Sequence, residues 1–507
     1  MNHLPVLPVL LPMFAGAWLA MTTGGGRGSH RLLSLMATLL QIPLAAALIY
    51  RAGGGISVYA LGNWPPPFGI VLVVDRLAAL MLLTTAVLAV AALLYALRGD
   101  DEEGKSFHTL FQFQLMGING AFLTGDLFNL FVCFEILLIA SYGLLLHGSD
   151  RLRTRAGLSY VVLNITGSAL FLIALGIFYG GVGTINMADL AVRIAGVPPP
   201  DAPLFGAAGA LLWTAFGLKA AAFPLHFWLP RAYAAAAAPA AALFAVMTKV
   251  GIYAILRVDT LIFNRGAGVL AMFAHDWLWA AALITITLGA VGALAARNIG
   301  ALVAYLVLSS VGVLLAAVVL GSREALVAGL YYLIHSTWIS GALFLLAGVI
   351  ARARGPAVAG LLIPGPPLGR PWFLSGLFFA GAVAVAGMPP FSGFLGKALL
   401  LAAAGDGPPA LGLYTAVLGG GLLILIALSR AGSTLFWRQT ETAAPGGTPD
   451  PVRLGAAVLL LAAAPILVIG AGPILAYLDG AAGQLLSPAV YIAEVLPHLT
   501  APSGGSP

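Results

Sequence analysis

The sequence predicts an all-α polytopic membrane protein, and three observations lead to this fold class. Hydrophobic residues make up 61% of the 507 residues and charged residues only 8%, whereas soluble globular proteins carry roughly 25% charged residues. The mean hydropathy is +1.01. Apolar runs long enough to cross a bilayer, which takes ~20 residues for a ~30 Å hydrocarbon core, recur along the whole chain. Nucleic-acid-binding proteins, secreted disulfide scaffolds and cytosolic enzymes are thereby excluded.

Charged, Gly-rich and Pro-rich stretches divide the chain into fourteen predicted membrane helices. Their approximate bounds are 4–22, 31–50, 75–97, 107–125, 127–147, 157–181, 204–229, 239–260, 277–296, 299–320, 324–352, 371–404, 409–430 and 453–478. The longer connecting pieces are 52–74, 182–203, 353–370, 431–451 and a tail over 479–507. No Lys or Arg precedes the first apolar run and no small-residue cleavage site follows it, so we expect a spanning helix there rather than a signal peptide.

No metal or cofactor site is predicted. Cys133 is the single cysteine of the sequence, which leaves it without a disulfide partner. No His or Cys cluster has the spacing of metal ligands, and no glycine-rich stretch follows a strand as a phosphate-binding loop would.

The distribution of Lys and Arg predicts the orientation of the chain. Loops after odd-numbered helices, with their flanking helix ends, hold fifteen of these residues. Those after even-numbered helices hold six, namely Arg51, Arg76, Arg193, Arg257, Arg265 and Arg323. Because Lys and Arg gather on the cytoplasmic side, the odd loops are expected to be cytoplasmic and both termini to face outward.

Four charged residues lie deep inside predicted helices, namely Lys219, Lys249, Lys397 and Glu135. A charge at the bilayer centre costs at least ~2.5–3.5 kcal/mol, so four such groups indicate a functional site. A desolvated lysine can release its proton near neutral pH, whereas an arginine keeps its charge. We therefore predict proton transfer by the lysines, with Glu135 modulating them. The alternative is that these groups form fixed structural ion pairs. One acid cannot pair with all three lysines, so this alternative is incomplete.

Two of these lysines lie beside prolines that interrupt their helices. Lys219 is five residues before Pro224, and Lys397 is seven after Pro390. Discontinuous helices of this kind line ion sites in transporters. The two helices are the seventh and twelfth, five apart, and a five-helix unit must insert upside down relative to its neighbour. An inverted repeat of helices 4–8 and 9–13 is therefore expected, with two ordinary proline kinks as the alternative.

The predicted organisation has four parts. Residues 1–106 hold helices 1–3, residues 107–260 the first five-helix repeat and residues 266–430 the second. Residues 431–507 hold a cytoplasmic loop, the last helix and a tail.

Two histidines are candidates to extend the proton path. His226 follows Lys219 by seven residues, which on a continuous helix would place both on one face about 10 Å apart. An interface residue is the alternative for His226. His335 is a similar candidate inside the eleventh helix. Asp126 begins the fifth helix, and we expect it to cap that helix.

Several stretches resemble the antiporter-like family. They cover residues 117–135, 139–142, 217–230, 248–253 and 387–397. This family includes the proton-pumping membrane subunits of respiratory complex I and the large subunits of Mrp (also called Mnh or Pha) multisubunit cation/proton antiporters. The sequence Leu-Thr-Gly-Asp-Leu-Phe-Asn-Leu-Phe at residues 123–131, and residues 182–190, are most similar to the D subunits of the Mrp antiporters.

The resemblance implies a role for each buried charge. Glu135 matches the glutamate of helix five in the family, Lys219 its paired lysine, Lys249 the central relay lysine and Lys397 the terminal lysine. Position by position, all four are present.

The resemblance also implies the activity and the partners. We expect a proton-translocating subunit of a Na⁺ or K⁺/H⁺ antiporter, a secondary transporter rather than an enzyme, working without a cofactor in a bacterial inner membrane. Mrp-type subunits A, B, C, E, F and G are the expected partners, with membrane lipid around them and no nucleic acid. A proton-pumping subunit of complex I or a related hydrogenase is the alternative. Complex I members commonly carry His and Lys in helix eleven, where this chain has Ser336 and Ser340 beside His335, which favours the antiporter.

The orientation can be checked with a reporter that is active only in the cytoplasm. Inserted near Thr448, in a predicted cytoplasmic loop, the reporter should be active. Fused after Pro507, on the predicted outer side, it should be silent. The reverse pattern would overturn the assignment from the Lys and Arg distribution.

Overall fold

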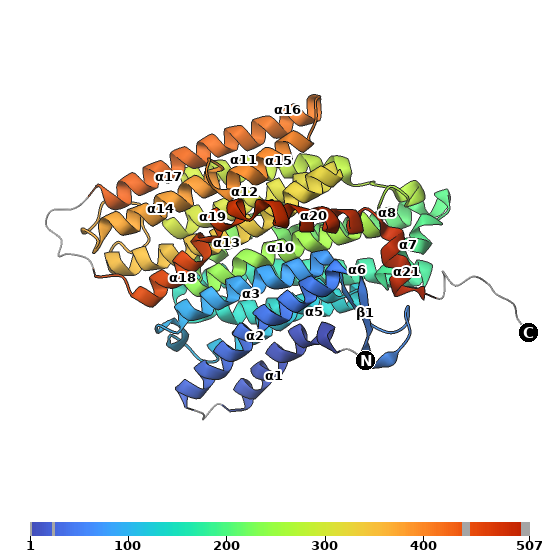
Figure 1. Cartoon of the computed structure of the whole chain (residues 1–507), viewed down its shortest axis with the longest axis horizontal. Coiled ribbons are helices and arrows are strands. Elements are labelled where there is room, and N and C mark those ends of the chain that lie inside the picture. The colour runs from blue at the N-terminus through green and yellow to red at the C-terminus, as the bar shows by residue number, and fades with distance from the viewer. Residues whose placement is uncertain (1–2, 23–25, 439–446, 498–507) are drawn as a thin grey trace, which may run out of the picture.

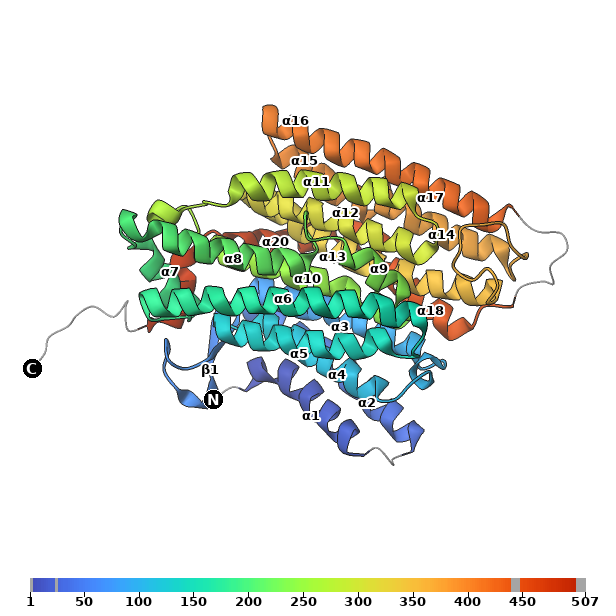
Figure 2. The same cartoon turned by 180° about the vertical axis from the view of Figure 1, so that it is seen from behind.

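The computed structural model describes residues 3–22, 26–438 and 447–497 and is almost entirely helical. Twelve helices in this part of the chain are long and apolar enough to cross a membrane. They run side by side along the long axis of the molecule (Figure 1), and the view from behind shows the same arrangement (Figure 2). The chain is a multi-pass membrane protein, as the sequence predicts.

The helices begin and end as follows. They are α1 (Leu7–Met21), α2 (Arg27–Gly53), α3 (Arg76–Ala96), α4 (Phe107–Leu123), α5 (Leu127–Leu146), α6 (Arg151–Val182), α7 (Met187–Ala195), α8 (Ala202–Ala220), α9 (Trp228–Ala235), α10 (Ala238–Leu261), α11 (His275–Ala295), α12 (Ile299–Leu320), α13 (Arg323–Arg354), α14 (Pro371–Ala386), α15 (Ser392–Ala403), α16 (Pro408–Tyr414), α17 (Gly420–Phe436), α18 (Pro451–Leu461), α19 (Ala463–Ile469), α20 (Ala471–Leu485) and α21 (Pro488–Val495). A π-helical turn, Thr415–Gly419, joins α16 to α17.

The fourteen predicted segments are all helical, and the seventh and twelfth are discontinuous, as predicted. The seventh consists of α8 and α9, and the twelfth of α14 and α15. A residue with positive φ follows the first half of each, Ala221 at 59° and Gly387 at 82°. The last predicted helix is broken as well, into α18, α19 and α20. In chain order, each broken helix is the fourth of its predicted five-helix unit.

Polar residues at the helix starts explain why the helices begin where they do. The Asp126 carboxylate accepts a hydrogen bond from the Asn129 amide at 2.8 Å, which confirms its expected role as the cap of α5. Asp150 caps α6 through the Arg153 amide at 2.7 Å. For this reason α6 begins at Arg151 rather than at the predicted residue 157, and its first turn is charged.

Three connecting pieces contain structure that the sequence does not predict. Residues 52–74 form an antiparallel hairpin of β1 (Ser57–Ala60) and β2 (Val71–Val74), with Ser57 opposite Val74. The 182–203 piece contains α7, an amphipathic helix. The tail predicted to begin at 479 remains helical to Leu485 and then forms α21. Residues 439–446 of the predicted cytoplasmic loop, and residues 498–507 with the fusion point at Pro507, lie outside the described residues.

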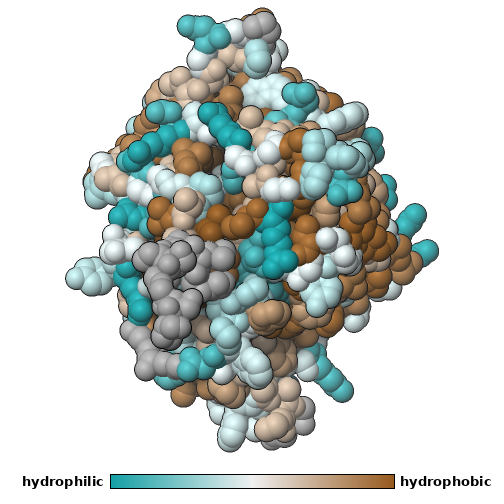
Figure 3. Space-filling model, turned by 90° about the vertical axis from the view of Figure 1, so that its right-hand side faces the viewer, coloured by the Kyte–Doolittle hydropathy of each residue, from teal (hydrophilic) through white to brown (hydrophobic). Residues whose placement is uncertain are grey.

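Helix α10 forms the centre of the bundle. All of its membrane-length window is buried, against 89% for α12 and α13 and 33% for α2 and α11 at the periphery. In Figure 1, α10 lies between α3 and α13, with α1 and α17 near opposite edges. Figure 3 looks at one end of the bundle, where hydrophilic groups cover much of the face and hydrophobic atoms gather along the flank. Polar side chains on α10 are therefore shielded from the surroundings by protein.

A buried ion pair lies near the C-terminal end of α10. Arg257 belongs to α10, is 4% exposed and bonds the Asp75 carboxylate at 2.6 Å. It also donates to the Tyr253 hydroxyl at 3.2 Å and lies over the Tyr491 ring of α21 at 5.3 Å. The hairpin and the C-terminal helix α21 thus close over the C-terminal end of α10.

The packing of α10 against α8 depends on Gly251. A Cβ at this position would lie 2.5 Å from the Ala220 backbone nitrogen, so Gly251→Ala must push the two helices apart. Overpacking of this kind costs about 1–3 kcal/mol, and we expect a lower melting temperature for the purified protein in detergent. Gly455→Ala on α18 is the matched control, because no atom lies within 4 Å of its added Cβ. Equal melting of the two variants would contradict the close approach.

Candidate functional site

Three lysines lie inside the protein at the positions that the sequence predicts. Lys249 is fully buried, and Lys219 and Lys397 are 7% and 8% exposed. Glu135 is half-buried on α5. None of the three lysines forms an ion pair with a carboxylate of the described residues. Their ammonium groups are held by hydroxyl and carbonyl oxygens instead.

A serine connects Glu135 to Lys219. The Ser168 hydroxyl, on α6, has two acceptors within reach, Oε1 of Glu135 and the Asn164 carbonyl at 3.0 Å. The same oxygen accepts a hydrogen bond from Lys219 Nζ at 3.4 Å. A hydroxyl can donate once and accept at the same time. Glu135 also acts on Lys219 through its charge, so the predicted pair is present with one hydroxyl between the partners.

The break after α8 positions Lys219. Its residue lies in the last turn of α8, where a cation interacts favourably with the negative end of the helix dipole. Trp228 at the start of α9 donates from Nε1 to the Leu218 carbonyl at 3.1 Å, which ties the two halves together. The close contact between Gly251 and Ala220 brings this end of α8 directly against α10.

Lys249 occupies the centre of the bundle, on the buried helix α10. Its Nζ donates to Ser310 Oγ of α12 at 3.1 Å, and the Ser310 hydroxyl donates to the Val307 carbonyl at 2.6 Å. A small cavity of about 10 Å³ lies between Lys219 and α10 and is lined on the α10 side by Met247 and Val250. That volume is close to what a single water needs.

His335 and Lys397 meet at the second break. His335 Nδ1 and Ser392 Oγ of α15 are 2.8 Å apart. Lys397 Nζ donates to the Val385 and Ala386 carbonyls, each at 3.0 Å. These carbonyls are freed because α14 ends at Ala386. His335 and Lys397 thus both contact the segment where α14 ends and α15 begins.

Together these groups form a series across the bundle. The helices that carry it are α5, α6, α8, α10, α12, α13 and α15. In Figure 2 they extend from α5, in the lower half of the view, to α15, in the upper half. The series is Glu135, Ser168, Lys219, Lys249 with Ser310, His335 with Ser392, and Lys397.

The geometry predicted for His226 is wrong. Because α8 ends at Ala220, His226 lies in the non-helical break and helical spacing does not relate it to Lys219. Its ring is half-buried and stacks near Phe223, with ring centroids 6.2 Å apart. His226 makes no hydrogen bond to Lys219 or Lys249, although its Nδ1 is buried without a partner among the described residues.

The three serines of the series are the residues that the sequence analysis missed. Ser168 and Ser310 lie in apolar helices that also hold other hydroxyl residues, such as Thr166 and Ser309, and Ser392 is the first residue of α15. The signal that could identify them is their position around the helix, because each hydroxyl must face a charged group on a neighbouring helix. That neighbour is known only after the helices are packed.

The described residues hold no group of three or more His, Cys, Asp or Glu side chains that could bind a metal ion. The chemistry that the site itself offers is proton exchange among lysine, imidazole, carboxylate and hydroxyl groups. Lysine and histidine both change charge by gaining or losing one proton, and serine can pass a hydrogen bond between them.

Known proteins resemble this chain over its full length. The family described as the membrane part of NADH:quinone oxidoreductase/Mrp antiporter matches residues 124–422. The D subunit of a probable K⁺/H⁺ antiporter of Rhizobium meliloti is 41% identical, over 100% of this chain and 99% of its own. The D subunit of a Na⁺/H⁺ antiporter of Bacillus subtilis is 38% identical over 98% and 100%. A chain of the Mrp complex from Dietzia sp. DQ12-45-1b superposes with a TM-score of 0.87 at 28% identity, over 98% and 100%. The chain therefore belongs to the NADH:quinone oxidoreductase/Mrp antiporter family of membrane subunits, among its antiporter D subunits.

Proposed function

We propose that this chain is the proton-translocating subunit of a multisubunit Na⁺ or K⁺/H⁺ antiporter. The observation that carries the proposal is the series of buried proton-exchanging groups from Glu135 to Lys397, in a chain that shares its length with antiporter D subunits. Protons move along this series near the bilayer midplane. Glu135 modulates Lys219, and protons pass by Lys249 and His335 toward Lys397.

The Ser168 contacts suggest how Glu135 modulates Lys219. While the hydroxyl donates to an ionised Glu135, its oxygen lone pairs and the nearby negative charge both stabilise the protonated lysine. When another charge neutralises or draws away Glu135, the hydroxyl turns to the Asn164 carbonyl. The lysine then loses its electrostatic support and releases its proton toward α10.

The absence of a carboxylate beside Lys249 and Lys397, among the residues that the structure describes, suits a relay. A buried ion pair would hold the lysine in one charge state, because separating the partners leaves an uncompensated charge. Hydroxyl and carbonyl dipoles support the ammonium more weakly, and they accept either charge state of the lysine. Energy for directional transport must therefore come from outside the relay, from the proton gradient and the partner subunits.

The relatives named as antiporter D subunits also support a membrane assembly. We place the chain in a bacterial inner membrane, with both termini on the periplasmic side, beside subunits A, B, C, E, F and G. Membrane lipid surrounds this assembly. A role in complex I or a related hydrogenase, driven by redox energy, is the second candidate because the same family model spans both groups.

Removing any relay lysine should abolish transport without loss of assembly. Lys249→Ala or Lys249→Met deletes the proton carrier. It also removes the cost of burying a charge, so the variant should still fold. Lys219→Arg should also fail because its guanidinium keeps its proton. The measurement is cation-dependent proton flux in vesicles, with co-purification of the partner subunits as the check on assembly. Normal flux with Lys249→Ala would exclude the central relay.

Ser168→Ala should weaken the coupling between Glu135 and Lys219. Loss of one hydrogen bond to charged groups costs about 1.5–3 kcal/mol, so we expect a reduction of transport by roughly 10-fold or more. Ser168→Thr keeps the hydroxyl and should retain most of the activity. Thr166→Ala is the matched control on the same helix, because Thr166 is exposed and its hydroxyl bonds only the Val162 carbonyl. Equal flux in Ser168→Ala and Thr166→Ala would remove Ser168 from the relay.

Deletion of the gene should distinguish antiport from redox-driven pumping. As an antiporter subunit, the chain is needed to expel Na⁺ or K⁺, so the deletion strain should become sensitive to these cations at alkaline pH while NADH oxidation is unchanged. The purified chain in liposomes should not exchange cations by itself, whereas the intact assembly should. Loss of NADH-driven proton pumping with normal salt tolerance would support the second candidate instead.

A further inference from the structure

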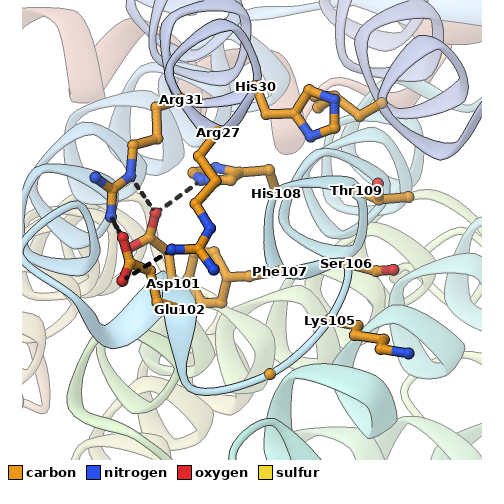
Figure 4. A pocket seen from close by; sticks show the side chains of 12 residues that line it. Arg27, His30, Arg31, Asp101, Glu102, Lys105, Ser106, Phe107, His108 and Thr109 are labelled. Carbon is orange, nitrogen blue, oxygen red and sulfur yellow. Dashed lines mark hydrogen bonds and ion pairs between the residues drawn. The ribbon is translucent and has the colours of Figure 1, made fainter. Parts of the chain in front are cut away.

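A polar pocket of about 480 Å³ lies at the arginine-rich end of the bundle, away from the relay. It is bounded by the end of α1, the start of α2, the 101–106 loop and the first turn of α4 (Figure 4). Its size is within the range of small-molecule sites. Its lining includes three Lys or Arg side chains, two carboxylates and two histidines.

The carboxylates of the pocket already have partners. Asp101 receives two hydrogen bonds from Arg31, at 2.6 and 2.8 Å, and a third contact from His108 at 3.1 Å. Burial raises the pKa of Asp101, but the bonds from His108 and Arg31 outweigh it and hold the pKa below its ordinary value. Glu102 bonds Arg31 at 2.8 Å and lies 3.8 Å from Arg27. One arginine against two carboxylates leaves this cluster with one negative charge, which Arg27 faces at 3.8 Å from Glu102.

The three Lys and Arg side chains of the pocket exceed its two carboxylates by one positive charge. Lys105 has no hydrogen bond or ion-pair partner in the described part of the chain, and Arg27 has only the long contact to Glu102. Figure 4 shows Lys105, Ser106 and Thr109 opposite the Arg31–Asp101 cluster. Ser106 precedes α4 without capping it by its side chain, so the positive end of this helix dipole also faces the pocket.

The surroundings of the pocket are apolar. Trp18 and Met21 on α1 are 60% and 75% exposed, and Leu32 and Met36 on α2 are 62% and 48% exposed. Leu19 reaches the pocket itself. A molecule with a negatively charged head and long apolar chains would contact the cations at the helix ends and these side chains along the membrane-spanning faces.

We propose that this pocket binds the phosphate headgroup of an anionic phospholipid. Arg27, Lys105 and the start of α4 hold the phosphate, and the exposed apolar side chains of α1 and α2 contact the acyl chains. Basic pockets between membrane helices are a recognised way of binding such headgroups. The adjoining apolar faces favour a lipid over an acidic segment of a partner protein. The inference does not depend on the proposed transport function.

The test uses the purified assembly and native mass spectrometry with added phosphatidylglycerol, phosphatidylethanolamine or inorganic phosphate. Each cation near a membrane surface contributes about 1 kcal/mol. The double variant Arg27→Ala, Lys105→Ala should therefore bind phosphatidylglycerol roughly 30-fold more weakly. The matched control is Arg151→Ala, Arg155→Ala, which removes two exposed cations at the same end of the bundle outside the pocket. The conservative pair Arg27→Lys, Lys105→Arg should retain binding.

Each other outcome would overturn the proposal. An equal loss in the control would mean that the general surface charge attracts the lipid. Retention of inorganic phosphate by the same residues, without a preference for phosphatidylglycerol over phosphatidylethanolamine, would indicate a free phosphate site. Unchanged lipid binding combined with loss of a partner subunit would assign the pocket to an acidic protein segment.

Discussion

The structure depends on one constraint: a charged group held at mid-membrane depth must be solvated by the protein itself. Water would otherwise supply dipoles, and their loss costs several kcal/mol per charge. The protein supplies these dipoles in different ways. A serine and a helix end stabilise the charge of Lys219, Ser310 that of Lys249, and two backbone carbonyls that of Lys397. An uninterrupted helix could not provide those carbonyls, because its own amides would occupy them. The break in the twelfth helix is the means of freeing them.

The molecule uses its charges in two different ways. At the ends of the bundle, arginines are locked to carboxylates, as in the bridges from Asp100 to Arg352 and Arg453, each at 2.7 Å. The Arg257–Asp75 pair closes the C-terminal end of α10 in the same manner. In the middle, lysines face neutral oxygens. Arginine keeps its proton and suits permanent joints, whereas lysine can change its charge when its surroundings change. The arginine–carboxylate pairs therefore stabilise the fold, whereas the buried lysines have no carboxylate that would fix their charge.

Much of this arrangement could be predicted from the sequence, because length and hydropathy determine membrane helices and the cost of a buried charge marks Lys219, Lys249 and Lys397. The breaks could be predicted from Pro224 and Pro390. The roles of the serines could not be predicted, because they depend on which residue of a neighbouring helix each hydroxyl contacts. The hairpin and α21 cannot be predicted in this way, because their burial comes from packing over the C-terminal end of α10. His226 was misplaced because helical spacing was carried across a break.

The position of Glu135 affects the stability of the chain before it joins other subunits. Glu135 is half-buried on the same face of α5 as Val132 and Ile139, which are 36% and 63% exposed. A newly inserted, solitary chain presents this face toward hydrocarbon, where a charge costs ~2.5–3.5 kcal/mol. A neighbouring subunit that covers the face removes that cost. The solitary chain is therefore less stable in the membrane than the same chain with this face covered by a neighbouring subunit.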